Sequence, residues 1–308
     1  KPGDVLLFSN PIYGGTHKFI HLMLHNWGVT SIGFNASDSK EDIIKLLEAN
    51  NAGGKLSMIY AETPANPTND LIDIEMCSEI AALYSTPGKK VLVAIDNTYM
   101  GPLWQHPLKH GADIVLYSAT KYIGGHSDLI AGAAIGSKEI IKAIKKSRTV
   151  FGTIIDPHTS WLLMRSLETL KIRMEAAAAN AEKVAAYLLQ HPKIEKVYYL
   201  GYTKKNNPGQ VAILKKQYLS NGAMLSFDVK GGEKEAFAFL NNLKHIKLAV
   251  SLGGTESLAE HPFSMTHADE PDEEKNRLGL TQKMVRLSVG IENPQDLVRD
   301  IEQALGAV

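Results

Sequence analysis

The sequence has little of three features that would assign it to a particular class of protein. It contains one cysteine, Cys77, among 308 residues, so no disulfide can form within the chain and a reducing compartment is the default. Lys and Arg number 33, as do Asp and Glu, which leaves no basic excess for nucleic-acid binding. No apolar run is long enough to span a bilayer. We therefore expect a cytoplasmic protein with neither a nucleic-acid partner nor a membrane partner.

The chain also opens without the features of a natural start. It has no initial Met and no basic-then-apolar signal, and residues 1–4 lead directly into an apolar run. We expect the sequence to begin in the middle of a longer protein.

What the first half does contain is an alternation of short apolar runs with amphipathic segments. The runs are mostly continuous, as in strands that are buried on both faces. They span residues 5–9, 31–34, 56–61, 91–95, 114–117 and 131–135, and the helix candidates between them span residues 39–50, 74–84 and 139–145. Cys77 lies in the second of these helices and is expected in the core. The alternation predicts an α/β fold with a mostly parallel sheet flanked by helices.

The second half of the chain does not continue the alternation of strands and helices seen in the first half. A helical stretch over residues 158–190 is long for one helix of a globular protein, which allows a bend. The later strand candidates span residues 194–199, 223–229 and 284–289, and the helix candidates span residues 233–243 and 294–305. We expect a large domain over residues 1–170 and a smaller α+β domain over residues 171–308.

Three of the apolar runs in the first half end in polar residues. Ligands of parallel α/β sheets bind at the carboxyl ends of the strands, so these positions are candidates for a site. The polar residues there are Glu62, Asn66, Asp96, Thr98, Ser118, Thr120 and Lys121.

Two of them suit a cofactor with a protonated pyridine nitrogen and an aldehyde. An Asp directly after an apolar run, such as Asp96, is costly to bury unless a cation meets it. A desolvated Lys has a lowered pKa, so a neutral Lys121 amine can attack an aldehyde. Pyridoxal phosphate (PLP) carries both groups. Ser118 and Thr120 flank Lys121 and offer hydroxyls to a phosphate, and the ring of Tyr13, just after the first strand, can stack on a pyridine.

Taken singly, each of these residues also has an ordinary structural explanation. Lys121 suits the surface, Asp96 suits a helix N-cap, Ser118 and Thr120 suit loop hydroxyls, and Tyr13 suits the core. The residues alone therefore suggest PLP without deciding it.

A set of motifs in one order resembles a known family. Residues 96–98, 118–122 and 125–128 resemble the signature of the PLP enzymes of cysteine and methionine metabolism, which include cystathionine γ-synthase, cystathionine γ-lyase and methionine γ-lyase. Further segments that match the family in the same order are residues 13–16, 62–67, 251–254, 261–267 and 286–290. The resemblance covers the whole chain and implies the PLP-dependent transferase fold type I.

The resemblance implies PLP as the cofactor, without a metal. Lys121 resembles the Schiff-base lysine and general acid–base, Asp96 the partner of the pyridine nitrogen, and Tyr13 the stacking ring and a candidate proton carrier. The other implied cofactor contacts are Glu62 as a supporting residue, Asn66 beside the phenolic oxygen, Thr98, and Ser118 and Thr120 as phosphate ligands.

The same resemblance implies where an amino-acid substrate binds. Arg286 resembles the clamp for the substrate carboxylate, where a planar guanidinium gives two-point recognition. Ser251 and Thr266 line the substrate side in this picture.

One part of the family pattern does not occur in the sequence. Family members carry an N-terminal segment with a loop that binds the phosphate and an arm that reaches into a neighbouring subunit's site, and neither matches here. We therefore expect the chain as written to bind PLP weakly. The resemblance also implies a homotetramer built from tight dimers with shared active sites, and a net charge of zero does not oppose such association.

The motifs give mixed indications of the reaction. Val250 stands where relatives that act on cystathionine place Glu, and an apolar residue suits a methyl thioether better than a distal ammonium. Methionine γ-lyases, however, have Cys where Gly15 stands and a Lys-Asp pair where Arg148 and Thr149 align. We expect γ-elimination that converts methionine to 2-oxobutyrate, methanethiol and ammonia. Cystathionine γ-lyase or γ-synthase activity is the alternative.

Two other classes remain open. The spacing of Ser118 and Lys121 fits the Ser-x-x-Lys pattern of serine β-lactamases, but the Lys-Thr-Gly motif of that class is absent. A non-catalytic protein with a PLP-enzyme fold is the more distant alternative, since a fold does not determine a function.

Overall fold

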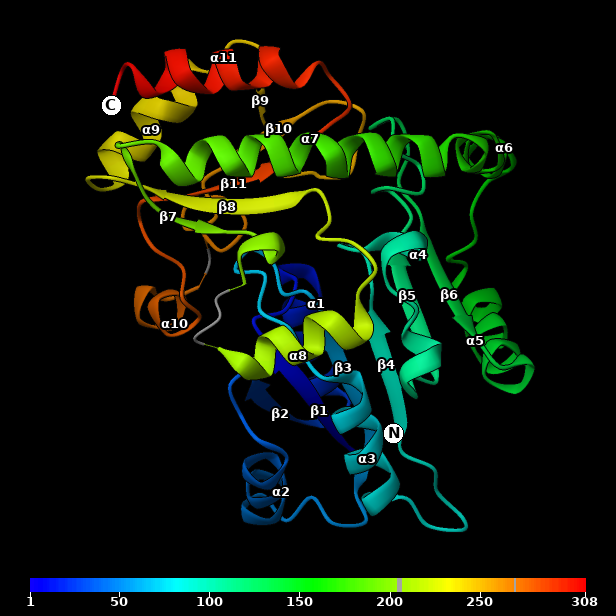
Figure 1. Ribbon diagram of the computed structural model, residues 1–308. Coiled ribbons are helices and arrows are strands. Elements are labelled where there is room, and N and C mark those ends of the chain that lie inside the picture. The colour runs from blue at the N-terminus through cyan, green and yellow to red at the C-terminus, as the bar shows by residue number, and fades with distance from the viewer. Residues whose placement is uncertain (204–206, 269) are drawn as a thin grey trace.

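The computed structural model describes residues 1–203, 207–268 and 270–308, and it contains two sheets with helices packed around them (Figure 1). The first sheet has the strand order β2-β1-β3-β4-β5-β6. Its strands are β1 (Val5–Asn10), β2 (Thr30–Asn35), β3 (Leu56–Glu62), β4 (Leu92–Asp96), β5 (Ile114–Ser118) and β6 (Gly132–Gly136). All neighbouring pairs are parallel except β5 with β6. The predicted α/β fold with a mostly parallel sheet is confirmed.

The helical segments of the first half connect these strands. They are α1 (Gly14–Lys18), a π-helical segment (Phe19–Leu24), α2 (Lys40–Ala49), α3 (Ile74–Tyr84), α4 (Gly101–Trp104), a 3-10 turn (Pro107–His110) and α5 (Lys138–Phe151). Side chains cap them where the sequence supplies short polar residues: Ser39 accepts from the backbone of α2, and Asp73 from that of α3. Each such cap stabilises a helix by about 1 kcal/mol.

The helix predicted over residues 139–145 is longer in the structure. It extends to Phe151, and its end is set by Gly152, which has a φ of 73°. Glycine adopts this left-handed conformation without strain, so it commonly terminates helices. The prediction ended α5 too early because residues 146–149 are all polar and interrupt the apolar pattern of the segment.

The second sheet has the strand order β7-β8-β11-β10-β9 and is antiparallel except between β9 and β10. Its strands are β7 (Ile194–Tyr198), β8 (Met224–Val229), β9 (Lys247–Leu248), β10 (Leu258–Glu260) and β11 (Met284–Ser288). The accompanying helices are α6 (Pro157–Glu168), α7 (Leu170–Gln190), α8 (Pro208–Gln217), α9 (Glu233–Asn242), α10 (Asp272–Arg277) and α11 (Pro294–Leu305), with a 3-10 turn at Leu200–Tyr202. Figure 1 shows α7 and α11 on the side of this sheet that faces away from the first sheet.

The long helical stretch predicted over residues 158–190 is interrupted at Thr169. This residue has φ −106° and ψ 2°, which separates α6 from α7. Its hydroxyl donates to the carbonyl of Ser166 and accepts from Nε of Arg173, so side-chain hydrogen bonds hold the break. The division into domains at residues 170 and 171 stays a prediction.

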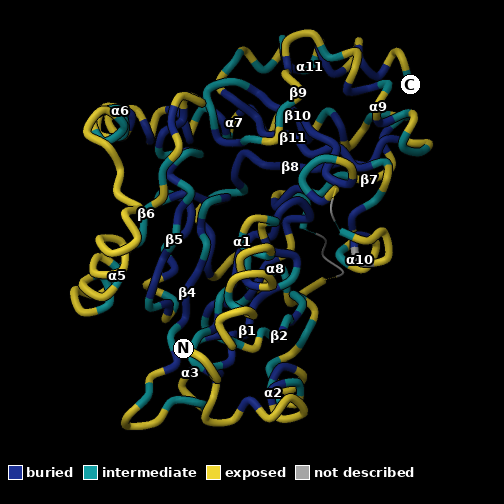
Figure 2. Tube along the Cα trace, turned by 180° about the vertical axis from the view of Figure 1, so that it is seen from behind, coloured by how far each residue is buried: buried dark blue, intermediate teal, exposed yellow. Residues whose placement is uncertain are grey.

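Among the described residues, the buried apolar side chains form one large cluster at the second sheet and two clusters at the first sheet. α7 contributes a continuous face to the core of the second sheet, including Met174, Ala181, Val184 and Leu188. Cys77 lies in the core of the first sheet, 1% exposed, which confirms its predicted placement. Figure 2 shows that the strands are largely buried, whereas α5 and α6 are largely exposed. Among the described residues, no helix is long and apolar enough to cross a membrane.

Helix α8 joins the two halves of the chain. It lies beside α3 in Figure 1 although it follows β7 in sequence. Gln217 donates to Asp73 at 2.7 Å, and Gln210 makes two hydrogen bonds with the backbone of Leu71. The hydroxyls of Tyr218 and Thr63 are 2.6 Å apart. These contacts hold the loop after β3, which carries part of the candidate site, against the second half.

Candidate active site

A cavity of about 310 Å³ lies at the carboxyl ends of β3, β4 and β5 and reaches the second sheet. Every predicted site residue except Ser251 lines it, and Ser251 contacts it through Lys121. The lining residues are Tyr13, Glu62, Asn66, Asp96, Thr98, Tyr99, Ser118, Thr120, Lys121, Ile130, Val250, Leu252, Thr266 and Arg286. The structure therefore brings the predicted residues to one place, while the role of each stays a prediction.

Asp96 is the last residue of β4, and its carboxylate is held by neutral donors. Thr98 donates to Oδ1 from its backbone at 3.0 Å and from its hydroxyl at 2.6 Å, and Tyr60 donates to Oδ2 at 3.2 Å. Burial raises the pKa of Asp96 above its ordinary value, although the hydrogen bonds from Thr98 and Tyr60 oppose that shift. A cationic ring nitrogen at this carboxylate would keep it ionised.

Glu62 ends β3 directly beside Asp96 on the neighbouring strand. It accepts from the backbone N–H of Tyr13 at 2.7 Å and from that of Asn66 at 3.2 Å. Burial, together with the charge of Asp96, raises the pKa of Glu62 to about 8. Glu62 therefore ties the segments that carry Tyr13 and Asn66 to the end of the sheet, in keeping with a supporting residue.

Lys121 lies in the turn after β5, and its amino group donates to the hydroxyl of Ser251 at 3.1 Å. Burial and then the positive charge of Arg286 lower the pKa of Lys121, while the charge of Glu260 opposes them. A lowered pKa makes the neutral, nucleophilic amine more accessible near neutral pH.

Ser118 and Thr120, which shortly precede Lys121, line the same cavity. The hydroxyl of Thr120 accepts from the N–H of Ala131 at 2.9 Å and donates to its carbonyl at 3.3 Å, so it is already fixed by the segment before β6. The backbone N–H of Ser118 donates to the hydroxyl of Thr98 at 2.9 Å. The ends of β4 and β5 are thereby locked together beneath the predicted phosphate ligands.

Tyr13 precedes α1, and its ring lies over the backbone of Gly15. A Cβ atom at Gly15 would sit 2.6 Å from Cε1 of Tyr13, so a larger residue there requires the ring to move. The side chain of Tyr13 is 56% exposed, which leaves its ring free to cover a ligand in the cavity. The glycine at position 15, which departs from the family pattern, therefore leaves the space that the Tyr13 ring occupies in this orientation.

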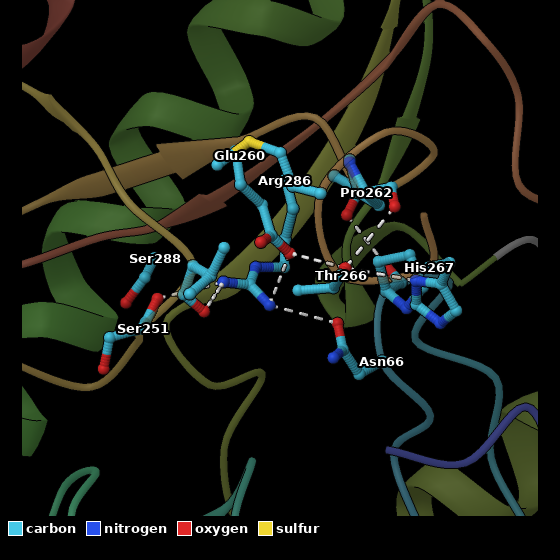
Figure 3. A network of polar contacts seen from close by, with 12 residues as sticks. Asn66, Ser251, Glu260, Pro262, Thr266, His267, Arg286 and Ser288 are labelled. Carbon is cyan, nitrogen blue, oxygen red and sulfur yellow. Dashed lines mark hydrogen bonds and ion pairs between the residues drawn. The ribbon is translucent and has the colours of Figure 1, made fainter. Parts of the chain in front are cut away.

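Arg286, on β11, is the centre of a buried polar network (Figure 3). Its Nη1 pairs with Glu260 at 2.7 Å and donates to Asn66 at 3.3 Å. Its Nη2 donates to the carbonyls of Val250 and Ser251 at 2.8 and 2.9 Å. This network fixes the guanidinium at the edge of the cavity, where the predicted carboxylate clamp should be.

Sequence reasoning missed three residues of the site. Tyr60 and Tyr99 donate hydroxyl hydrogen bonds to Asp96 and Asn66, respectively. Glu260 is fully buried beside Arg286. The position of Glu260 directly before the matched segment 261–267 was the available signal for this residue. Tyr60 and Tyr99 look like ordinary core aromatics in the sequence.

These observations test which cofactor the cavity fits. A half-buried Asp96 carboxylate with only neutral hydrogen-bond donors and a Lys121 amine of lowered pKa match the two ends of PLP, the pyridinium and the aldehyde. Within the described part of the chain, no group of three His, Cys, Asp or Glu side chains is arranged to hold a metal ion. The family model for Cys/Met metabolism PLP-dependent enzymes matches residues 1–306.

This chain belongs to the Cys/Met metabolism PLP-dependent enzyme family. It is 43% identical to an L-methionine γ-lyase of Fusobacterium nucleatum subsp. polymorphum over 99% of this chain and 74% of the relative. It is 41% identical to a cystathionine γ-lyase of Bacillus subtilis (strain 168) over 98% of this chain and 76% of the relative.

Solved structures of the Cys/Met metabolism family have the same fold. A crystal structure of cystathionine γ-lyase from Lactobacillus plantarum complexed with L-serine matches with a TM-score of 0.90 and 36% identity, covering 100% of this chain and 77% of the other. A crystal structure of cystathionine γ-synthase from Xanthomonas oryzae pv. oryzae in complex with cystathionine matches with a TM-score of 0.90 and 33% identity, covering 100% of this chain and 76% of the other. The predicted fold type I, the PLP cofactor and an enzyme of sulfur amino-acid metabolism are therefore confirmed.

Proposed function

We propose that this enzyme catalyses γ-elimination on L-methionine, giving 2-oxobutyrate, methanethiol and ammonia. The observation that carries the proposal is the apolar part of the cavity wall, formed by Ile130, Val250 and Leu252, in the same cavity as Arg286. An apolar wall suits a methyl thioether, whereas it offers no hydrogen-bond or charge partner to the distal ammonium of cystathionine.

When bound, PLP supplies a ring that accepts the electrons of the substrate carbanion. Asp96 would hold a positive charge at the ring nitrogen through its carboxylate. Lys121 would hold the cofactor and move the α-proton, and burial, which lowers the pKa of its amino group, favours the neutral amine that this needs. Arg286 binds the substrate carboxylate and Ser251 orients the Lys121 amine through the hydrogen bond between them.

A second candidate, cystathionine γ-lyase, is favoured by Arg148. This residue lines a larger hollow of about 860 Å³ between β6 and α5, which shares Tyr13, Asp96 and Ser118 with the cavity. A cation at this position can pair with the distal carboxylate of cystathionine, which methionine lacks. The relative from Bacillus subtilis, named a cystathionine γ-lyase, supports the same candidate.

The test compares substrates with the full chain in the presence of excess PLP. Methionine, cystathionine and an O-acylhomoserine with added cysteine are each supplied, and 2-oxobutyrate and released thiol are measured. The proposal predicts the highest kcat/KM with methionine and methanethiol as the released thiol. Thiol-dependent cystathionine formation as the only activity would contradict it and establish the γ-synthase alternative.

We also propose that the enzyme works in the cytoplasm as a homotetramer with active sites at subunit contacts. The exposed apolar side chains of α5, α6 and the start of α7 support this, among them Val150, Phe151, Trp161, Met164 and Ile172, each more than half exposed. Large exposed apolar side chains mark an interaction surface in soluble proteins where they gather on one face. Light scattering coupled to gel filtration tests the assembly, and a monomer at micromolar concentration would contradict it.

A further inference from the structure

Glu260 and Arg286 form a buried ion pair directly behind the cavity. They are cross-strand neighbours on β10 and β11, and Oε1 of Glu260 lies 2.7 Å from Nη1 of Arg286. Glu260 is 0% exposed and Arg286 2% exposed. Arg286 lines the cavity, whereas Glu260 lies behind it in the sheet.

The pair leaves polar atoms without partners. Oε2 of Glu260 and Nε of Arg286 are both buried and accept or donate no hydrogen bond within the described residues. Oε1 of Glu260, in contrast, also accepts from the hydroxyl of Thr266 at 3.3 Å. A buried ion pair with unsatisfied atoms is poorly compensated for its lost hydration. A proton or a polar group that pairs with these atoms would therefore stabilise the site.

The charges that face Glu260 come from every side of the site. Arg286 faces it from β11 and Lys121 from the turn after β5, and both favour its ionised form. From the 261–267 segment, Thr266 links it to His267, whose pKa burial lowers to about 4, so that this ring is neutral near pH 7. The phenol of Tyr99, whose pKa is raised chiefly by burial, is neutral as well.

A substrate carboxylate at Arg286 changes this balance. One guanidinium would then serve two carboxylates in a region from which water is largely excluded. Like charges around one buried site raise the pKa of one of the carboxyl groups. The substrate carboxylate lies in the open cavity that Arg286 lines, whereas Glu260 is fully buried outside that lining. Glu260 is therefore the carboxyl group whose pKa rises.

Resting on the proposed binding of substrate at Arg286, we propose that Glu260 takes up one proton from solvent when a carboxylate binds there. The proton goes to Oε2, the oxygen without a partner, and no other bond forms or breaks. The incoming negative charge and the incoming proton cancel, so the buried region keeps a constant net charge. Glu260 is in this sense a positioning residue that sets how strongly Arg286 attracts a carboxylate.

The pKa of Glu260 agrees with this assignment. Burial raises it to about 7, with Arg286, Thr266 and Lys121 opposing the shift. Below about pH 7 the carboxyl is already protonated, and binding needs no proton. Above that pH the carboxyl is ionised until the ligand arrives, so binding must be accompanied by proton uptake.

The test measures proton uptake by isothermal titration calorimetry. The full chain with excess PLP is titrated with 4-(methylthio)butyrate, which keeps the carboxylate and thioether of methionine but has no amine, in buffers of different ionisation enthalpy. We expect uptake of about one proton per bound ligand near pH 8 and almost none near pH 6. The dissociation constant should rise by up to about tenfold per pH unit above pH 7.

Three variants separate Glu260 from other titrating groups. Glu260→Gln should remove most of the uptake and flatten the pH dependence of the affinity, while Glu260→Asp, which keeps a titratable carboxyl, should retain uptake. Asp228→Asn is the matched control, because Asp228 is a buried carboxyl of the same sheet that bonds Tyr198 and Thr281 outside the cavity. Its proton uptake should equal that of the unsubstituted chain.

Three results would overturn the inference: equal uptake by the unsubstituted and Glu260→Gln chains, binding without uptake near pH 8, or no carboxylate binding at all. The ligand is not turned over, so the 2-oxobutyrate assay tests the proposed function separately. Elimination without proton uptake contradicts only the inference, and proton uptake without elimination contradicts only the proposed function.

Discussion

The amino group of Lys121 donates a hydrogen bond to the hydroxyl of Ser251, a residue 130 positions further along the chain. Lys121 follows a strand of the first sheet, and Ser251 lies between β9 and β10 of the second. The site is therefore complete only when the two sheets are packed together. The loop that carries Ser251 is held against Lys121 because Gly253, in the same loop, packs closely on the backbone of Tyr122.

That packing predicts a large effect of Gly253→Ala. Gly253 has a φ of 73°, and a Cβ there would lie 2.8 Å from the backbone nitrogen of Tyr122. We expect a loss of about 2 kcal/mol in the free energy of unfolding from backbone strain and displaced packing, measured by urea denaturation. Activity should fall as well, because Ser251 moves away from Lys121.

Gly53→Ala is the matched control for this substitution. A Cβ at Gly53 meets no atom within 4 Å, so this variant should stay within about 0.5 kcal/mol of the original chain. Equal denaturation midpoints for the two variants would contradict the role given to Gly253.

Much of the first sheet could be predicted because its strands are buried on both faces. Continuous apolar runs mark β1, β3, β4 and β5, and their ends place Asp96 and Lys121 at one edge. The antiparallel direction of β6 could not be predicted, since it depends on a pairing with β5 rather than on local pattern.

The unpredicted parts of the site depend on contacts between distant segments. Glu260 reaches its partner through the pairing of β10 with β11, and neither a short strand nor a cross-strand neighbour is marked in the sequence. Helix α8 has no clear apolar face in the sequence. Hydrogen bonds from Gln210 and Gln217 to the first half of the chain help to hold it in place. Hydrogen-bonded packing of this kind leaves no periodic pattern.

Asp96→Asn should impair catalysis more than folding. The amide oxygen can still accept from Thr98, and the amide nitrogen can donate to the hydroxyl of Tyr60, but the side chain carries no charge to stabilise a protonated ring nitrogen. We expect kcat with methionine to fall by about 10²-fold or more, by analogy with loss of one preorganised electrostatic contact. Asp228→Asn should leave kcat within about twofold of the original, as it lies outside the cavity. An unchanged kcat for Asp96→Asn would contradict the assignment.

The stability of the chain without PLP should fall as the pH rises. Glu62 has its pKa raised from 4.5 to about 8 by burial and by Asp96, so between these values the folded state binds more protons than the unfolded state. Stability is then fully present below pH 4.5 and is lost towards pH 8, at up to about 1.4 kcal/mol per pH unit. Glu62→Gln should flatten this dependence, measured by urea denaturation at a series of pH values. A variant whose stability falls as steeply as that of the original chain would show that other groups cause the effect.

Val250→Glu should shift substrate preference from methionine towards cystathionine. The new carboxylate can pair with the distal ammonium of cystathionine, and it removes part of the apolar wall. We expect the ratio of kcat/KM values to change by about tenfold or more. Leu83→Glu, at an exposed position of α3, tests for a general effect of added charge and should leave the ratio unchanged. A ratio that Val250→Glu leaves unaltered would remove the support for methionine specificity.

The most direct measurement of the central claim is reduction of the full chain with borohydride in the presence of PLP, followed by mass spectrometry of its peptides. The account predicts a reduced pyridoxyl group on the peptide that contains Lys121, and a Lys121→Ala variant that lacks this adduct and loses about 10³-fold or more in activity. An adduct found on another lysine, or full activity without Lys121, would contradict it.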